Sequence, residues 1–178
     1  MIRLFAALSI PPEIGEALAR RQEGVTGARW RPLEALHVTL RFVGEVREDV
    51  ARDLDAELLE TRLPPFEITL GGAGSFGEGA DLHAVWAGVE LNPALNRLAK
   101  ACETAARRVG LQPDLRTYRP HVTLAYLRQP DPVEVAHWIQ ANNLLKSPPI
   151  PIKSFGLYAS TLGGEGSRYR LEADYPLG

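Results

Sequence analysis

The sequence of 178 residues has a single cysteine, Cys102, and no apolar run near the roughly 20 residues that a membrane-spanning helix requires. One cysteine excludes an internal disulfide. It falls at helical spacing with apolar neighbours in LNRLAKACETAARRVG, which favours a buried structural thiol over a nucleophile. The first residues, MIRLFAALSIPPE, have one arginine and a short apolar run that stops at two prolines, and they predict a first strand rather than a signal peptide. We therefore expect a cytoplasmic protein.

Lysine is also scarce, because seventeen of the twenty basic residues are arginines, and the formal net charge is −2. This charge argues against a protein that coats long nucleic acid through a broad basic face, but it leaves room for a local phosphate pocket. Arginine suits bidentate phosphate contacts, although a codon preference for arginine explains the same bias. Hydrophobic residues at 45% and charged residues at 24% are typical of an ordinary globular protein.

Strands and helices alternate along the chain. Apolar alternation and turn residues predict strands at 3–10, 37–46, 66–70, 83–91, 121–127, 150–161 and 167–177. Helical spacing predicts helices at 11–25, 48–63, 93–110 and 132–143, the third with Asn92 as N-cap and Gly110 as C-cap. Cutting this order near the middle gives two similar halves, which indicates a duplicated unit. Such an order favours a layered α/β or α+β architecture, and we expect two small sheets that face one another.

The connections predict a fringe of loops around a groove. The segment GGAGSFGEGA (71–80) lacks both the GxxxxGK[ST] and the GxGxxG pattern, so we expect a loop at a strand end rather than a phosphate cradle. The segment ARWRPLEAL (28–36) is expected as an exposed loop with basic and aromatic character. Residues 111–119 are expected as a further loop, and 162–166 as a glycine-rich turn between the last two strands.

The tetrapeptide His-Val-Thr-Leu occurs twice, at 37–40 and at 121–124, in a chain with only four histidines. Alternate residues of a strand share a face, so His and Thr of each copy point one way and Val and Leu the other. Val and Leu can anchor each strand in the core. The side chains of His and Thr then lie together on the opposite face. Two such strands across a groove bring two imidazoles and two hydroxyls to one place.

This set of groups fits phosphoryl transfer. An in-line displacement at phosphorus needs a base behind the attacking oxygen and an acid behind the leaving oxygen, and two histidines near neutral pKa can divide these roles. Two threonine hydroxyls can hold the non-bridging oxygens and stabilise the charge that develops on them. No metal is required by this scheme.

Other interpretations stay open at this point. A half-buried core histidine explains a single copy of the motif, and an old duplication could preserve the letters without function, although core packing alone would retain Val and Leu more readily than His and Thr. A zinc site is the chemical alternative, but it needs a third ligand. His83, at the head of a strand, and His137, on a predicted helix surface, lack a matching context.

At the two HVTL segments the sequence resembles the 2H phosphoesterase superfamily, which is defined by two HxTx motifs. Within it, the chain is similar to the bacterial RNA 2′,3′-cyclic phosphodiesterases, also called 2′-5′ RNA ligases. The likeness covers nearly the whole chain, through the segments RLFAALSIPPE, HVTLRFVGEV, HAVWAGVE, RPHVTLAYL and FGLYASTLGGEGSRYRLEADYPL. It implies a bilobal α+β fold in one domain over 1–178, with duplicated sheets related by a pseudo-twofold axis, flanking helices and both motifs in a central cleft.

The resemblance also implies an activity and roles for four residues. The activity is hydrolysis of RNA 2′,3′-cyclic phosphate ends to 2′-phosphates, without a cofactor or metal; with a 5′-hydroxyl in place of water, the reaction forms a 2′-5′ link without ATP. His37 is then the proton donor to the leaving 3′-oxygen and His121 the proton acceptor from water. Thr39 and Thr123 hold the phosphate. The expected partners are RNA ends with a 2′,3′-cyclic phosphate or small cyclic nucleotides, and the expected state is a monomer.

One position departs from the family pattern. Many relatives carry Arg or Lys two residues after the Leu of the second motif, where this chain has Tyr126. Two other arginines are candidates for a phosphate contact: Arg41, which strand alternation predicts on the face of the first His and Thr, and Arg119, two residues before the second motif. Phe42 and Tyr126 could stack on a base, but alternation favours the core for both.

A nucleotide- or RNA-end-binding module without catalysis is the alternative function. It predicts saturable binding of a 2′,3′-cyclic nucleotide without product. A pure binder has no need of an acid and a base together, so the presence of both histidines favours the enzyme.

Overall fold

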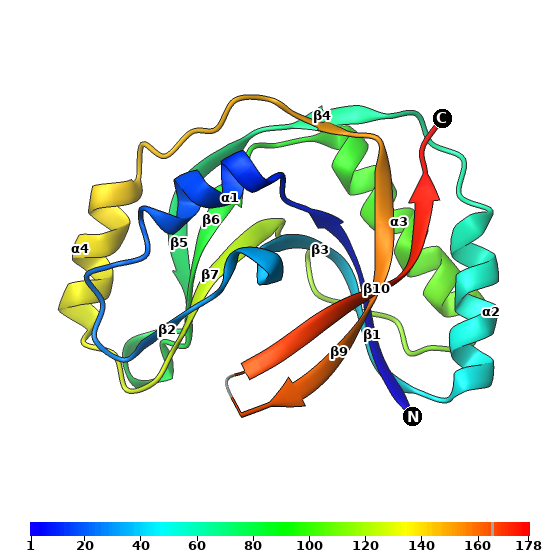
Figure 1. Ribbon diagram of the computed structural model, residues 1–178, viewed down its shortest axis with the longest axis horizontal. Helices are drawn as coiled ribbons and strands as arrows, with labels where there is room; N and C mark the ends of the chain where they lie inside the picture. Colours follow the sequence, from blue (N-terminus) through cyan, green and yellow to red (C-terminus); the bar gives the residue numbers. More distant parts are fainter. Residues whose placement is uncertain (165) are drawn as a thin grey trace.

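The computed structural model describes residues 1–164 and 166–178 (Figure 1). Glu165, in the expected turn at 162–166, lies outside the described residues. The strands are β1 (Ile2–Ser9), β2 (Ala28–Trp30), β3 (His37–Val46), β4 (Phe66–Ile68), β5 (Leu70–Phe76), β6 (Ala84–Val89), β7 (His121–Leu127), β8 (Ile150–Ile152), β9 (Ser154–Gly163) and β10 (Gly166–Pro176). The helices are α1 (Pro12–Ala19), α2 (Glu48–Leu59), α3 (Pro93–Arg108) and α4 (Pro132–Asn142), with short 3₁₀ turns η1 (Leu33–Ala35) and η2 (Gly79–Asp81).

Two half-sheets meet edge to edge at the strands that carry the repeated motif. The strand order is β10-β9-β1-β3-β7-β6-β5, with β2 paired to β7, while β4 and β8 form a separate two-stranded sheet. All pairings are antiparallel, and β3 and β7 are joined through a single pair, Val38 and Val122. The expected α+β class with duplicated sheets is confirmed. The two half-sheets are joined through their edge strands β3 and β7 into one sheet, rather than facing one another as two separate sheets, as the sequence analysis expected.

The helices cover the two halves on opposite sides of the junction. In Figure 1, α2 and α3 lie at one end of the arc and α1 and α4 at the other. Helix α3 contacts β3, α2 contacts α3 and β10, and α4 contacts β5. The Val and Leu of both motifs are buried in the resulting core, with Val38 and Val122 both at 0% exposure. Their burial commits the intervening His and Thr of each strand to the opposite face of the sheet.

Helix α3 begins at Pro93, as its sequence predicts, but ends at Arg108 with Val109 as C-cap, one residue before the expected cap Gly110. The side chain of Asn92 accepts a hydrogen bond from the backbone N–H of Leu95 at 3.0 Å, which caps the first turn. Gly110 follows the last turn with φ of +89°, a conformation that glycine adopts without strain. The apolar face of the helix includes Cys102, which is 2% exposed. The expectation of a buried structural thiol is therefore confirmed.

Cys102 is expected to resist thiol reagents in the native protein. Burial raises the pKa of its thiol to about 12, so almost no thiolate forms at neutral pH and no reagent reaches the sulfur. Titration with a chromogenic disulfide should detect less than a tenth of the thiol before urea is added and one thiol per chain after unfolding. Rapid labelling of the folded protein at pH 7 would contradict this placement.

Three segments differ from the sequence expectation. Residues 71–76, expected as a loop, belong to β5, and glycine is needed there for packing: a Cβ on Gly74 would lie 2.4 Å from the ring of Trp86 on the neighbouring strand. Residues 28–30, expected within an exposed loop, form β2 against β7. The strand expected over 150–161 divides into β8 and β9, which belong to different sheets. The first two helices end earlier than expected, at Ala19 and Leu59.

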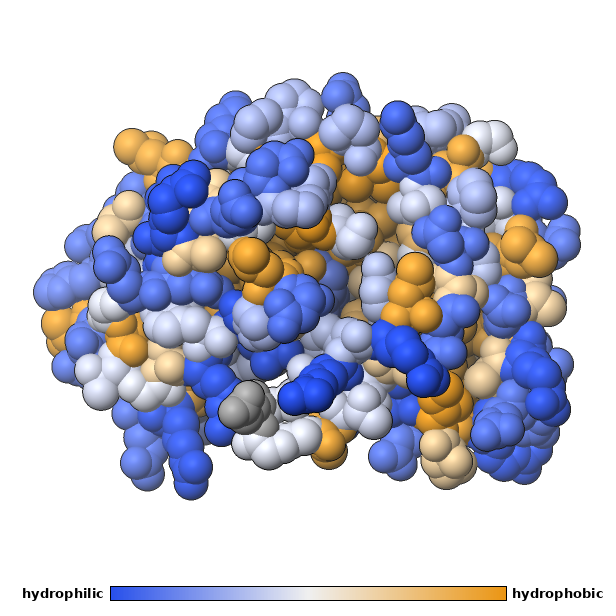
Figure 2. All heavy atoms as spheres, in the orientation of Figure 1, coloured by the Kyte–Doolittle hydropathy of each residue, from blue (hydrophilic) through white to orange (hydrophobic). Residues whose placement is uncertain are grey.

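One face of the molecule is mostly hydrophilic. In the face drawn in Figure 2, hydrophilic side chains predominate, with smaller groups of apolar side chains between them. Within the described part of the chain, no helix is long and apolar enough to cross a bilayer.

Candidate active site

The two motif strands lie side by side and in opposite directions. Their common pair, Val38 and Val122, sits at the centre of both motifs. Extending this antiparallel register places His37 opposite Thr123 and Thr39 opposite His121. The four side chains line one cavity of about 110 Å³. At about 30 Å³ for each water in the liquid, the cavity holds a group of several heavy atoms, which is the scale of a phosphate.

Both imidazoles are held by the same hydrogen bond. Nδ1 of His37 lies 2.7 Å from the carbonyl oxygen of Ala35, and Nδ1 of His121 lies 2.7 Å from that of Arg119, in each case two residues earlier in the chain. A carbonyl only accepts, so Nδ1 carries the proton in both rings. Nε2 is then the nitrogen left for proton transfer, as an acceptor in the neutral ring and a donor in the charged one.

Aromatic rings pack around each imidazole in a matching way. Tyr169 meets the His37 ring edge-on at 84° with centroids 5.1 Å apart, and Phe76 meets the His121 ring at 84° and 4.8 Å. A second ring from the neighbouring strand completes each side: Phe5 lies 4.8 Å from His37, and Trp86 lies 6.1 Å from His121. These contacts restrict both imidazoles to one orientation and shield them from water.

The pKa values of both histidines are lowered. The pKa of His37 is lowered to about 4, mainly by burial and to a smaller extent by positive charge at Arg31 and His121, while the hydrogen bond to the carbonyl of Ala35 acts in the opposite direction. Burial also lowers the pKa of His121, opposed by the carbonyl of Arg119. Both rings are therefore neutral at pH 7 while the cavity holds no anion. A bound phosphodiester would bring a negative charge beside them and raise both pKa values.

A pH titration by NMR should reveal this coupling. We expect the pKa of His37 near 4 in the unliganded protein, and saturating inorganic phosphate should raise that pKa by about 1 to 3. Because the unfolded chain binds this proton below pH 6.5 and the folded chain only near pH 4, the free energy of unfolding should fall as the pH drops through this interval. A His37 pKa near 6.5 that phosphate does not move would contradict the placement of this ring in an anion site.

A β-bulge follows the His-x-Thr segment in each motif strand. Thr39 and Arg41 of β3 pair with two consecutive residues of β1, so β3 has one extra residue between them. In the same way, Thr123 and Ala125 of β7 pair with two consecutive residues of β6. One extra residue reverses the alternation beyond that point, and bulges of this kind recur beside active sites. Sequence reasoning assumed regular strands and therefore placed the residues after each motif on the wrong face.

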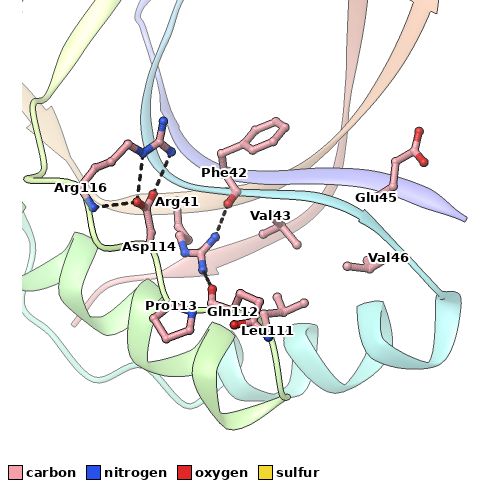
Figure 3. A pocket seen from close by; sticks show the side chains of 10 residues that line it. All are labelled: Arg41, Phe42, Val43, Glu45, Val46, Leu111, Gln112, Pro113, Asp114 and Arg116. Carbon is pink, nitrogen blue, oxygen red and sulfur yellow. Dashed lines mark hydrogen bonds and ion pairs between the residues drawn. The ribbon is translucent and has the colours of Figure 1, made fainter.

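The bulges overturn three face assignments. Phe42 and Tyr126, expected in the core, are 42% and 48% exposed, and Tyr126 lines the cavity. Arg41, expected beside His37 and Thr39, points away from the cavity and forms an ion pair with Glu103 of α3. It also donates hydrogen bonds to the carbonyl oxygens of Phe42 and of Gln112, the latter at 2.6 Å (Figure 3).

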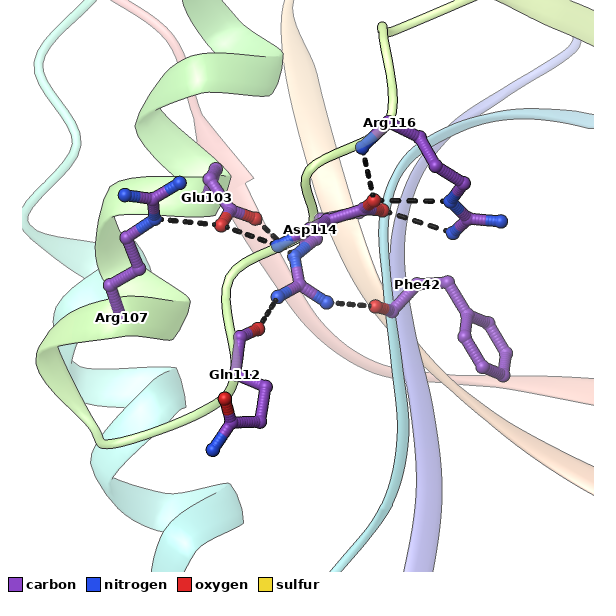
Figure 4. A network of polar contacts seen from close by, with 7 residues as sticks. Phe42, Glu103, Arg107, Gln112, Asp114 and Arg116 are labelled. Atoms are coloured by element: carbon purple, nitrogen blue, oxygen red, sulfur yellow. Dashed lines mark hydrogen bonds and ion pairs between the residues drawn. The ribbon is translucent and has the colours of Figure 1, made fainter.

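Arg41 belongs to a polar network that holds the loop before β7. Glu103 also binds Arg107 at 2.9 Å and accepts a hydrogen bond from the backbone N–H of Asp114 at 3.0 Å (Figure 4). These contacts fasten residues 112–116 to α3. Arg119, the other candidate for a phosphate contact, is exposed and lines a larger groove of about 1030 Å³ that adjoins the cavity through Thr39 and His121.

Sequence reasoning missed a residue that the structure brings into the cavity. Arg31 lies at the end of β2, in the segment expected as an exposed loop, yet it is 5% exposed and lines the cavity with Tyr126 and Tyr169. No local pattern signals this position, because β2 is three residues long and its partner is nearly 100 residues away in the sequence.

The remaining histidines lie outside the cavity. His83 lines the larger groove with its Nδ1 bonded to the carbonyl of Asp81 at 2.9 Å, and His137 is exposed on α4. Across residues 1–164 and 166–178, no three side chains of the metal-binding types His, Cys, Asp and Glu come together.

The two middle strands of the antiparallel sheet each present His-x-Thr to one phosphate-sized cavity. This arrangement is that of a two-histidine phosphoesterase. Residues 10–161 match the family model described as the 2′-5′ RNA ligase superfamily. The match spans most of the chain, and the chain belongs to this superfamily. The resemblance drawn from the two motifs is thereby confirmed.

Proteins named RNA 2′,3′-cyclic phosphodiesterase are similar to this chain over nearly all its length. One from Escherichia coli K12 is 31% identical over 177 residues, which cover 94% of this chain and 92% of the relative. One from Archaeoglobus fulgidus is 28% identical over 172 residues, covering 95% and 97%.

Solved structures agree with the fold. A protein from Thermus thermophilus superposes with a TM-score of 0.82 at 26% identity, covering 98% of this chain and 97% of that one. The apo form of E. coli LigT superposes with a TM-score of 0.78 at 28% identity, covering 99% and 97%, and LigT has also been solved in complex with 3′-AMP. The bilobal two-histidine fold expected from the sequence is confirmed.

Proposed function

We propose that this protein hydrolyses RNA ends that carry a 2′,3′-cyclic phosphate, giving 2′-phosphomonoesters by metal-independent acid–base catalysis. The observation that carries the proposal is the single cavity lined by His37, Thr39, His121 and Thr123. The shared name of the E. coli and A. fulgidus relatives supports the substrate class.

In the proposed reaction the phosphorus of the cyclic diester lies in the cavity between the two imidazoles. Thr39 and Thr123 donate hydrogen bonds to its non-bridging oxygens. Nε2 of His121 accepts a proton from water as the water oxygen bonds to phosphorus. Nε2 of His37 donates a proton to the 3′-oxygen as the bond between phosphorus and that oxygen breaks. The phosphate stays on the 2′-oxygen, and the two rings exchange protons with solvent to restore the starting state.

The proposed acid must be charged when the reaction starts. Burial holds the pKa of His37 at about 4 in the unliganded protein. A phosphodiester anion in the cavity favours the charged ring, so the acid forms when substrate binds. The same cycle run with a 5′-hydroxyl in place of water forms a 2′-5′ link without ATP, because the energy of the cyclic phosphate is conserved in the new diester.

We further propose that residues 1–178 act as one bilobal unit and as a monomer. One chain supplies both His-x-Thr strands, and the cavity takes side chains from both halves. The larger groove beside His121 is the space from which an RNA strand can reach the cavity, since Lys100, Arg116 and Arg119 are among its lining residues.

The test is incubation with an RNA oligonucleotide that ends in a 2′,3′-cyclic phosphate, with EDTA present. We expect complete conversion to the 2′-phosphate, identified by its resistance to a phosphatase that removes only terminal 3′-phosphates, by its removal with a non-specific phosphatase, and by ³¹P NMR. Saturable binding without product would support the binding module instead. A 3′-phosphate product, or loss of turnover with EDTA that is restored by a divalent metal, would contradict the mechanism.

A further inference from the structure

Arg31 reaches the catalytic cavity from the residue that directly follows β2, a strand that carries neither motif. Its backbone N–H donates to the carbonyl oxygen of Leu124 at 2.8 Å, and its own carbonyl accepts from Nε2 of Gln22 at 2.9 Å. The preceding residue, Trp30, pairs with Ala125 of β7. The backbone of Arg31 is thus attached to the strand of the second motif, just beyond its bulge.

The side chain of Arg31 crosses to the other half of the molecule. Nη2 donates to the carbonyl oxygen of Ser167 at 3.2 Å and lies 3.3 Å from the hydroxyl of Tyr169, both on β10. The guanidinium carbon lies 5.6 Å from the ring centroids of Tyr126 and of Tyr169, so two aromatic rings flank the charge. These contacts hold the guanidinium in one place beside the cavity.

This arrangement places a fixed positive charge where an anion is to bind. The two hydrogen bonds described for Arg31 go to neutral oxygens through Nη2, and a guanidinium has further N–H donors on Nε and Nη1. Of the arginines considered, Arg41 is paired with Glu103 and Arg119 is exposed in the outer groove. Arg31 is the arginine among the residues that line the cavity with both histidines.

We propose that Arg31 is a catalytic residue that donates to the non-bridging oxygens of the phosphate and stabilises the charge that builds up on them in the transition state. The ring of Tyr126, two residues after the Leu of the second motif, lies against its guanidinium. The inference rests on the proposed function, because it assigns Arg31 to the same phosphodiester.

Arg31 also couples anion binding to the proton on His37. In the unliganded protein its charge helps to lower the pKa of His37. An anion between the two groups offsets the charge of Arg31 and attracts the proton of the acid. The cavity therefore charges its general acid when a phosphodiester occupies it, which links binding to the first proton transfer.

The test compares Arg31→Met with Arg31→Lys and with Arg29→Met, a control two residues earlier, on β2, whose side chain is exposed. We expect Arg31→Met to lower kcat/KM about 10²- to 10³-fold, mostly in kcat, as for loss of one donor to a developing oxyanion. Arg31→Lys should have a kcat/KM about tenfold higher than that of Arg31→Met but still well below the wild type, because lysine keeps the charge without the bidentate geometry. Arg29→Met should stay within about twofold. An Arg31→Met variant that folds and retains kcat/KM within about threefold would overturn the proposal.

A second measurement separates this inference from the proposed function. Inorganic phosphate binding is measured by calorimetry on wild-type protein, on Arg31→Met and on Arg31→Lys. The lysine variant keeps the positive charge, so it serves as the test if Arg31→Met fails to fold. We expect an affinity for phosphate at least fivefold weaker in either variant, and a His37 pKa that rises in Arg31→Met because a positive neighbour is lost. If wild-type protein fails to turn over cyclic phosphate RNA, the proposed function fails, while an Arg31-dependent phosphate affinity still supports the site. Equal phosphate affinity in the wild type and the variants overturns the assignment of Arg31 to the phosphate.

Discussion

His37→Ala and His121→Ala are each expected to lower kcat on a 2′,3′-cyclic phosphate RNA end by about 10²- to 10⁴-fold, the usual worth of a positioned general acid or base. Each change removes one proton-transfer group, while the matching threonine and the rest of the cavity stay in place. KM should change much less than kcat, because proton transfer occurs only in the transition state. Steady-state kinetics with the purified variants measures both quantities.

The control for the histidine variants is His137→Ala, which removes an exposed imidazole on α4, outside the cavity. It should keep wild-type kinetics, and circular dichroism should show the same thermal transition for all three variants within a few degrees. The double variant should lose much less than the product of the two single losses, because acid and base act in the same step. Wild-type kcat in either single variant would end the two-histidine mechanism.

Thr39→Val and Thr123→Val are expected to have the second largest effects. Each removes one hydroxyl from the cavity with little change of side-chain shape, and loss of one donor to a developing oxyanion costs about 10²- to 10³-fold in kcat. Both threonines stand on the same face as their histidines, ahead of the bulges that reverse the alternation. Kinetics with cyclic phosphate RNA and phosphate affinity by calorimetry measure the effect on chemistry and on binding.

Thr161→Val on β9 is the matched control, because its side chain is exposed on a strand outside the cavity and valine suits a strand as well as threonine does. Its kinetics should equal those of the wild type. Valine variants of both motif threonines that kept full activity and full phosphate affinity would remove the hydroxyls from the mechanism.

Much of the site was predictable because its signals are local. The identical letters of the two motifs define strands that begin at His37 and His121, as the sequence predicts, and the burial of Val and Leu fixes the face of His and Thr. The start of the helix over 93–108 was equally readable, since Asn92 caps it, and its end lies close to the expected cap Gly110, just before that glycine's positive φ.

The rest depended on contacts between distant segments. A bulge leaves no local mark in HVTLRFVGEV or HVTLAYL, so the alternation misassigned the residues that follow each motif. Arg31 became part of the cavity because β2 pairs with β7, a pairing that three residues cannot signal. The glycines over 71–76 resembled a loop, but the ring of Trp86 on the next strand requires their lack of a side chain.

The most direct test of the central claim is a crystal structure with uridine 2′,3′-cyclic vanadate, which imitates the five-coordinate phosphorus of an in-line displacement. We predict Nε2 of His37 within hydrogen-bond distance of the apical 3′-oxygen and Nε2 of His121 within hydrogen-bond distance of the opposite apical oxygen, with Thr39 and Thr123 on the equatorial oxygens. A complex in which both imidazoles lie on the same side of the vanadium, or in which only one of them contacts the ligand, would contradict the division of acid and base between the two motifs.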